Sequence, residues 1–163
     1  MLRMHLLRLL FRSSHVRFRS PTGTARFAPL KAAQLRESAY VIAFTADGSH
    51  VLLAPRDDGA GLEIPGGGRD ARESIRDAAL RETFEETGVT IAGELRKLLV
   101  HLDWFFDDSD GRMYVSKQHF FIASLPPRTP VSDQSLLTET SSAGDHLNPN
   151  DADVIALAFQ KRL

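Results

Sequence analysis

Apolar and polar positions along the chain predict several strands around a helix, followed by a second helix near the C-terminus. Residues 38–45 and 50–56 are apolar and rich in β-branched side chains, and Asp47-Gly48 between them predicts a hairpin turn. Further strands are expected at residues 62–64, 94–106 and 113–125, with a turn at 107–111 between the last two.

The first helix is predicted over residues 75–87 by signals at both of its ends. Ser74, with Asp77 three positions later, resembles a capping box, and Gly88 suits the left-handed residue that ends a helix. The face expected to pack consists of Leu80, Thr83, Phe84 and Thr87, with both threonine hydroxyls bonded to the backbone.

The second helix is predicted over residues 149–161, where Asn148 followed by Pro149 makes a good N-cap. The side chains that it is expected to bury are Val154, Ile155, Leu157, Ala158 and Phe159. A chain of 163 residues with 42% hydrophobic residues is long enough for one core and too short for two.

Three carboxylates share one face of the first helix. Glu82, Glu85 and Glu86 fall within an arc of about 100°. Like charges at this spacing destabilise a helix by about 0.2–0.5 kcal/mol per pair. A solvated acidic surface is one interpretation. A hard divalent cation is the other, because Mg²⁺ binds clustered carboxylate oxygens, and the glycine-rich turn before the helix favours it.

The flanking residues complete a string of fixed spacing that begins at a glycine, reaches a glutamate after five residues and continues, after seven more, as R-E-x-x-E-E-x-G-V. Its fixed positions are Gly67, Glu73, Arg81, Glu82, Glu85, Glu86, Gly88 and Val89. The string resembles the Nudix box of the Nudix hydrolases. It departs from the family at Thr83, where an aliphatic residue is usual, and at Arg72, where a second glycine is common.

The resemblance implies an α/β fold, a Nudix-type α/β/α sandwich with a mixed sheet between helices, over residues 37–163. It also implies Mg²⁺-dependent hydrolysis of the pyrophosphate bond of a nucleoside diphosphate linked to another moiety, with Mn²⁺ as an alternative ion. A non-catalytic Nudix-fold module that binds a nucleotide or a protein is the alternative. Retention of every box glutamate favours catalysis.

The resemblance also implies roles for individual residues. The metal ligands would be Glu82, Glu85, Glu86 and the backbone carbonyl of Gly67, with Glu82 as ligand or as the base that orients water. An ion pair between Arg81 and Glu73 would clamp the loop onto the helix.

A late glutamate serves as general base in many family members, and residues 126–148 offer Asp133, Glu139 and Asp145. We expect Glu139 to take this role ahead of an unassisted Glu82. Arg56, on the strand before the catalytic loop, is a candidate phosphate contact. The aromatic run at residues 104–106 is more typical of a core than of a surface that stacks on a base.

Other site types are disfavoured by composition. There are no cysteines, and none of the six histidines forms an H-x-x-x-H pair, so neither disulfides nor a histidine metal site is expected. No uninterrupted apolar run approaches the roughly 18 residues of a membrane span. Oligomeric state and the particular substrate stay open.

Charge is distributed unevenly along the chain. Residues 1–36 hold eight of the 20 Lys and Arg and no acidic residue, whereas residues 37–163 carry nine more acidic than basic residues. We expect residues 1–36 to be a basic N-terminal extension outside the domain, with the composition of a mitochondrial transit peptide. The alternatives are a disordered basic arm that contacts nucleic acid or anionic lipid, and upstream sequence from a wrongly assigned start codon. A cytoplasmic location is the alternative to mitochondria. The acidic excess disfavours nucleic acid as a partner of residues 37–163.

Overall fold

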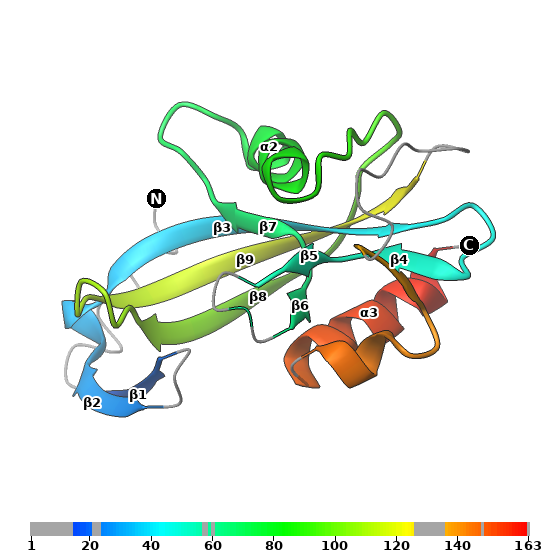
Figure 1. Ribbon diagram of the computed structural model, residues 1–163. Coiled ribbons are helices and arrows are strands. Elements are labelled where there is room, and N and C mark those ends of the chain that lie inside the picture. Colours follow the sequence, from blue (N-terminus) through cyan, green and yellow to red (C-terminus); the bar gives the residue numbers. More distant parts are fainter. Residues whose placement is uncertain are drawn as a thin grey trace. The chain divides into compact units, whose positions relative to one another are not determined.

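The structure is a computed structural model that describes residues 15–20, 24–56, 59, 61–125, 136–147 and 149–162 (Figure 1). The chain forms two compact units. The larger unit comprises Ser38–Val100 and Gln118–Leu163, and the smaller unit comprises His101–Lys117 and the described residues up to Glu37. Three long strands have residues in both units: β3 (Gln34–Phe44), β8 (Arg96–Phe106) and β9 (Met113–Ser124).

The sheet of the larger unit has the strand order β10-β4-β3-β9-β8, and β7 also pairs with β3. Its short strands are β4 (His50–Leu52), β7 (Gly66–Gly68) and β10 (Leu137–Glu139), and β5 (Ala54–Pro55) pairs with β6 (Leu62–Glu63) in a separate ribbon. Phe44 lies opposite Val51 in antiparallel register. The predicted hairpin at Asp47-Gly48 is therefore confirmed.

Two helices cover opposite faces of this sheet, α2 (Ile75–Thr87) on one and α3 (Pro149–Lys161) on the other (Figure 1). The central strand β3 serves both faces, because successive side chains of a strand point in opposite directions. Val41 joins the core under α2 and Ile42 joins the core under α3. The predicted α/β/α arrangement with a mixed sheet is confirmed.

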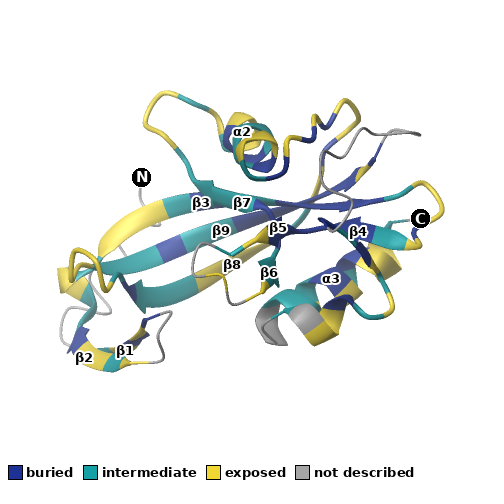
Figure 2. Cartoon of the chain, viewed as in Figure 1, coloured by how far each residue is buried: buried dark blue, intermediate teal, exposed yellow. Residues whose placement is uncertain are grey.

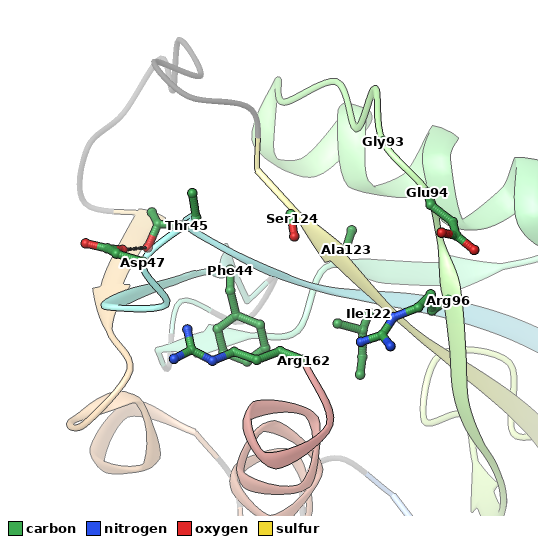
Figure 3. A pocket seen from close by; sticks show the side chains of 11 residues that line it. Phe44, Thr45, Asp47, Gly93, Glu94, Arg96, Ile122, Ala123, Ser124 and Arg162 are labelled. Atoms are coloured by element: carbon green, nitrogen blue, oxygen red, sulfur yellow. Dashed lines mark hydrogen bonds between the residues drawn. The ribbon is translucent and has the colours of Figure 1, made fainter.

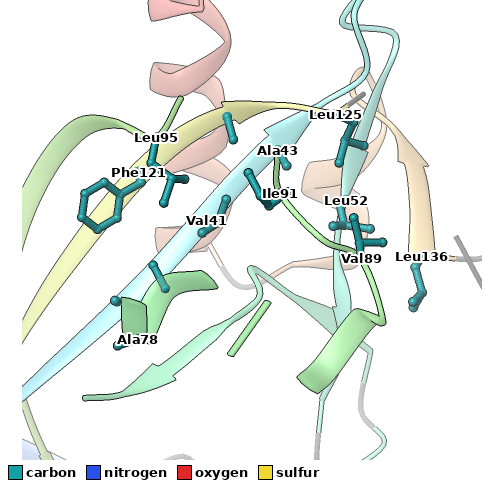
Figure 4. Packing of buried hydrophobic residues seen from close by; sticks show 13 residues of the cluster. Val41, Ala43, Leu52, Ala78, Val89, Ile91, Leu95, Phe121, Leu125 and Leu136 are labelled. Atoms are coloured by element: carbon teal, nitrogen blue, oxygen red, sulfur yellow. The ribbon is translucent and has the colours of Figure 1, made fainter. Parts of the chain in front are cut away.

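The core beneath α2 is built from small helix residues and larger strand residues (Figure 4). Ala78 and Ala79 are fully buried and bring the helix backbone close to the sheet. They pack in one cluster with Val41, Leu52 and Phe121. The small side chains of α2 thus fix the height of the helix above the strands.

The predicted ends of α2 are confirmed by its caps. The Ser74 hydroxyl accepts a hydrogen bond from the Asp77 N–H at 3.1 Å, and Gly88 ends the helix in the left-handed conformation with φ 69°. Both predicted threonine bonds are present, with Thr83 donating to the Ala79 carbonyl at 2.7 Å and Thr87 to the Thr83 carbonyl at 2.6 Å. These bonds satisfy two buried hydroxyls.

Phe84 and Phe159 correct the predicted packing faces. Phe84 is 55% exposed, because the buried stripe of α2 follows the alanines to Thr83 and Thr87 and leaves Phe84 on the outer side. On α3, Ile155 and Ala158 are buried as predicted, but Phe159 stays 39% exposed. The predicted cap of α3, Asn148, lies outside the described residues.

The smaller unit contains two strands that the sequence analysis did not expect. β1 (His15–Arg19) pairs antiparallel with β2 (Ala25–Pro29), a 3-10 helix spans Leu30–Ala32, and β1 pairs in parallel with β8 at Phe105. Phe18 is fully buried with Phe106 and the partly buried Trp104. The aromatic run therefore contributes to a core, as favoured, while the domain boundary at residue 37 stays a prediction.

Exposed positions include the outer side of α2, the first residues of β3 and parts of β1 and β2 (Figure 2). Among the described residues, no helix has the length and apolar character needed to cross a membrane.

Candidate active site on the glycine loop and α2

The glycine strand β7 places the candidate site against the second half of α2, where Arg81, Glu82 and Glu86 lie next to its three glycines. β7 pairs with β3 so that Gly66, Gly67 and Gly68 lie opposite Tyr40, Ala39 and Ser38. α2 contacts both β7 and the neighbouring β5. The loop between β7 and α2 is therefore fixed to the sheet at one end and to the helix at the other.

The predicted ion pair between Arg81 and Glu73 is present and has two parallel hydrogen bonds. Arg81 Nη2 donates to Glu73 Oε1 at 2.6 Å, and Arg81 Nε donates to Glu73 Oε2 at 3.1 Å. The same Nη2 donates to the Gly68 carbonyl at 3.0 Å. A bidentate guanidinium fixes direction as well as distance, so this pair clamps the loop onto α2.

The loop itself folds around Glu73. The Asp70 N–H donates to Glu73 Oε1 at 2.8 Å, and Arg69 Nη1 donates to the Asp70 and Glu73 carbonyls at 3.1 Å each. The hydrogen bond from Arg81, followed by that from Asp70, lowers the pKa of Glu73 to about 2. The bond to Glu73, with further ones to Glu82 and Glu85, raises the pKa of Arg81 above its ordinary value. Both members of the clamp are therefore charged at neutral pH.

The three box carboxylates on α2 face the loop in different ways. Arg81 Nη1 lies 2.9 Å from Glu82 Oε1 and 2.9 Å from Glu85 Oε2. Glu82 keeps 16% of its side chain exposed, whereas Glu85 keeps 55%. Glu86 Oε2 accepts a hydrogen bond from the Gly66 N–H at 3.0 Å. Sequence reasoning missed this backbone donor, although the glycine turn offered the signal.

Gly67 allows Glu82 to approach the loop backbone. A Cβ at Gly67 would lie 2.6 Å from Glu82 Cδ, which is closer than any real contact. The absent side chain leaves a cradle in which the carboxylate lies against the backbone. Carboxylate and carbonyl oxygens in such a cradle suit a hard divalent cation.

In the part of the chain that the structure describes, no three acidic or histidine side chains are already placed together to bind a metal ion. Glu82 and Glu85 share Arg81, and Glu86 holds the loop. One guanidinium thus offsets much of the repulsion that the helical spacing predicts. The metal-ligand assignment of Gly67, Glu82, Glu85 and Glu86 stays a prediction with which this donor set is compatible.

Glu139 is not brought to this cluster. It ends β10 opposite His50 and lines a cavity of about 710 Å³ whose other wall is formed by α3 residues, among them Ile155 and Phe159. α2 lies on the opposite face of the sheet (Figure 1). The side of β10 on which Glu139 lies could not be predicted from the sequence. Asp133, another candidate base, lies outside the described residues.

Arg56 follows directly after β5, the strand that contacts α2. Its backbone N–H donates to the Gly61 carbonyl at 3.0 Å, and its carbonyl accepts from the Gly59 N–H at 3.0 Å. The residue is half-buried. Its position is compatible with the predicted phosphate contact, which stays a prediction.

A second cavity, of about 460 Å³, opens where β3 and β9 end (Figure 3). Arg96 and Arg162 line it, together with Asp47 and Glu94. Arg96 Nη2 donates to the Lys161 carbonyl at 2.6 Å and so satisfies a carbonyl at the end of α3. Arg162 lies over the Phe159 ring at 4.2 Å. No box carboxylate lines this cavity, so we assign it no part in the chemistry of α2.

The family model for the NUDIX domain matches residues 34–158. The chain therefore belongs to the Nudix family. Nudix domains act on phosphoric anhydride bonds, and Nudix hydrolases use divalent metal ions.

Individual relatives resemble the chain over different lengths. Nudix hydrolase 4 of Arabidopsis thaliana is 51% identical over 49 residues, which span 30% of this chain and 23% of that protein. The NUDIX domain of Shewanella oneidensis NrtR, solved in complex with ADP ribose, matches with a TM-score of 0.61 at 16% identity, over 85% of this chain and 95% of that one. The Ap4A hydrolase of C. elegans matches with a TM-score of 0.56 at 18% identity, over 80% and 100%. The two structures support the fold.

Proposed function

We propose that the protein hydrolyses the pyrophosphate bond of a nucleoside diphosphate linked to another moiety, in a reaction that depends on Mg²⁺. The observation that carries the proposal is the Arg81–Glu73 clamp, which holds the glycine loop against the helix that bears Glu82, Glu85 and Glu86. Such a clamp positions carboxylates at a fixed distance from loop carbonyls, which a diphosphate site with bound cations needs.

The residues that would hold Mg²⁺, or Mn²⁺ in its place, are Glu82, Glu85, Glu86 and the carbonyl of Gly67. When bound, the cation would neutralise the negative charge of the diphosphate and the charge that develops on the leaving oxygen. The chain's own contribution is to fix these oxygens. Glu73 and Arg81 orient the loop and the helix without touching the substrate, so they are positioning residues.

We assign to Glu82 the orientation of the attacking water. Its carboxylate is the most enclosed of those bonded to Arg81 Nη1, and it lies against Gly67. A carboxylate within hydrogen-bond reach of water can accept its proton as the water attacks phosphorus. Glu139, the base expected from the sequence, faces α3 instead. Glu139→Gln decides whether Glu139 takes part: we expect it to keep its activity, and a large loss of kcat would return the role of base to Glu139.

The substrate class proposed is a nucleotide with a phosphoric anhydride. Two proteins of the same fold carry nucleotide ligands in their names, ADP ribose for the Shewanella NrtR domain and Ap4A for the nematode hydrolase. Both compounds belong in the test panel, with nucleoside triphosphates, sugar nucleotides and diphosphoinositols. Arg56 is our candidate for a contact with a substrate phosphate.

The test is hydrolysis of this panel by the purified protein with Mg²⁺ or Mn²⁺, followed by EDTA. We expect at least one compound to be cleaved and EDTA to abolish cleavage. Glu85→Gln should lower the rate by about a hundredfold or more, while metal-free stability changes by less than about 1 kcal/mol, because the exposed pair with Arg81 contributes little. Glu94→Gln, an exposed glutamate outside the cluster, is the matched control.

Two outcomes would overturn this proposal. A protein that binds a nucleotide tightly but cleaves nothing in the panel is a binding module. Full activity of Glu85→Gln together with a clearly lower melting temperature would make the cluster structural.

We further propose that residues 1–36 direct the protein to mitochondria and stay on the chain after import, because residues 15–19 and 25–29 form the β1–β2 hairpin whose Phe18 is buried with Phe106. The support is their basic, acid-free composition. A fluorescent protein fused behind residues 1–40 should enter mitochondria of a eukaryotic cell. A diffuse cytosolic signal would refute import.

A further inference from the structure

The β1–β2 hairpin of the smaller unit presents one outer face of unusual composition. Phe18 and Ala28 point inward and are buried. Because side chains alternate along a strand, and Arg17 lies directly opposite Phe27 in the antiparallel register, six side chains share the opposite side, those of Ala25 and Pro29 among them. We call its exposed members the hairpin outer face; they are His15, Arg17, Arg19 and Phe27.

Phe27 is 72% exposed on this face. Its neighbour Arg26 lies opposite Phe18 on the other side of the hairpin and, although exposed, places its guanidinium 4.4 Å from the centroid of the Phe106 ring. A shift of the strand by one residue would exchange the two side chains. The register thus puts an arginine on the side of the core and a phenylalanine in solvent. The free energy that burial of the phenylalanine ring would supply is therefore not gained. An exposed ring on a paired hairpin is available to a ligand.

The cations beside Phe27 form no ion pair with an acidic side chain of the described residues. Arg17 and Arg19 are exposed, and no carboxylate within the described ranges pairs with either. Arg17 is the cross-strand neighbour of Phe27 and Arg19 is a diagonal one, so both guanidinium groups reach the space around the ring. The face therefore combines one aromatic surface with two unneutralised positive charges.

We propose that the hairpin outer face binds single-stranded nucleic acid, with a base stacked on Phe27 and backbone phosphates paired with Arg17 and Arg19. Bases stack on exposed aromatic rings regardless of sequence, and arginine pairs with phosphate in two-point geometry. A ring on β2 beside two charges on the neighbouring strand β1 suits a base and the phosphates next to it along one nucleic acid strand. An anionic membrane surface is bound better by a broad apolar face with many contacts.

This site goes beyond the proposed hydrolase function and uses none of its residues. The acidic excess that disfavours nucleic acid belongs to residues 37–163, whereas the hairpin outer face lies before them. The acidic turn of the same unit is engaged locally: hydrogen bonds from Ser109 lower the pKa of Asp107, and Tyr114 donates to Asp110 at 3.0 Å. A contact of one or two nucleotides is the expected footprint.

The experiment measures the anisotropy of labelled 12-nucleotide oligo-dT and oligo-U with the full chain, over a series of salt concentrations. We expect both single strands to bind more tightly than a duplex of equal length. Two phosphate contacts give a slope of log K against log salt of about −1.4. Phe27→Ala should weaken binding about tenfold, and the double variant Arg17→Gln/Arg19→Gln should remove most of the slope.

The controls use matched residues elsewhere on the chain. Phe84→Ala removes another exposed phenylalanine, and Lys97→Gln removes an exposed cation of β8; neither should alter binding. Phe27→Ala should leave hydrolysis unchanged, so failure here and failure of the hydrolase proposal are distinguishable.

Three results would overturn the proposal. They are an equal loss of binding in Phe27→Ala and Phe84→Ala, a duplex that binds as well as the single strands, and Phe27-dependent binding to phosphatidylserine vesicles without binding to either oligonucleotide. The last would make the face a lipid contact.

Discussion

Gly67→Ala is expected to impair activity while leaving the fold intact. A Cβ at this position lies 2.6 Å from Glu82 Cδ and 2.7 Å from both carboxylate oxygens. Ordinary carbon contacts need about 3.5 Å, so the carboxylate has to move by about 1 Å. Gly67 is not among the glycines with positive φ, so alanine fits its backbone. The whole perturbation therefore falls on the position of Glu82.

Its effect on stability should be small. The displaced group is the end of a flexible side chain, and replacement of glycine by alanine at a compatible position stabilises by about 0.4–1 kcal/mol through the unfolded chain. We expect the free energy of unfolding to stay within about 1 kcal/mol of wild type. A misplacement of about 1 Å at a reacting centre lowers the rate about a hundredfold, so kcat should fall by that order.

Three measurements test this separation: urea unfolding, kcat on a substrate found in the panel, and calorimetric titration with Mn²⁺ without substrate. Gly93→Ala is the neutral control, since its Cβ would meet only the Ser124 carbonyl oxygen at 3.8 Å. Gly66→Ala is the control for a clash that falls on the backbone. Gly66 has φ 154°, and its Cβ would lie 2.3 Å from the Ala39 carbonyl oxygen, so this variant should lose about 1–3 kcal/mol of stability or more.

The reasoning would be refuted by either of two results. Full activity and Mn²⁺ affinity in Gly67→Ala would show that the place of Glu82 against the loop does not matter. A loss of stability equal to that of Gly66→Ala would show that the clash falls on the backbone and not on a movable carboxylate.

Three further predictions concern stability. Hydrogen bonds, of which that from Arg81 is the strongest, lower the pKa of Glu73 from 4.5 to about 2. The contribution of Glu73 to the free energy of unfolding is therefore present above about pH 4.5 and is lost as pH falls toward 2. In urea unfolding, Glu73→Gln should be less stable than wild type at pH 7 and should depend less on pH across that window. Thr83→Val should stay within about 1 kcal/mol of wild type in thermal unfolding, because the lost hydroxyl bond is local to the helix. Phe18→Ala should destabilise the core around it by about 3–5 kcal/mol, and the fluorescence of Trp104, the single tryptophan, should report the loss; an unchanged signal would contradict its burial there.

Local signals in the sequence predicted the candidate site well. The ends of α2 follow from Ser74 and Gly88, whose capping bonds involve residues within four positions along the chain. The pair of Arg81 with Glu73 follows from a motif of fixed spacing. Both features depend on short stretches of chain, where propensity and spacing determine the geometry.

Features that depend on distant parts of the chain were not predictable in this way. Glu139 is a late glutamate of the kind expected to act as general base, yet its strand pairs with β4 and it lines the cavity beside α3. Phe84 and Phe159 sit at helical spacing suited to burial and are exposed, because other residues already fill the buried side of each helix: Ala78 and Ala79 on α2, and Ile155 and Ala158 on α3. Composition set the first 36 residues apart, but Phe18 is buried with Phe106, a partner far along the chain.

Arg81 explains how a helix tolerates three clustered carboxylates and still leaves them available. Its Nε and Nη2 edge is committed to Glu73 and the Gly68 carbonyl, which fixes the loop. Its Nη1 alone reaches Glu82 and Glu85. A cation that binds those two carboxylates competes with one nitrogen and leaves the other two donors in place, so the loop keeps its position as the carboxylates change partner. A lysine has a single ammonium without this fork, so it cannot do both at once, which is a physical reason for arginine at this position.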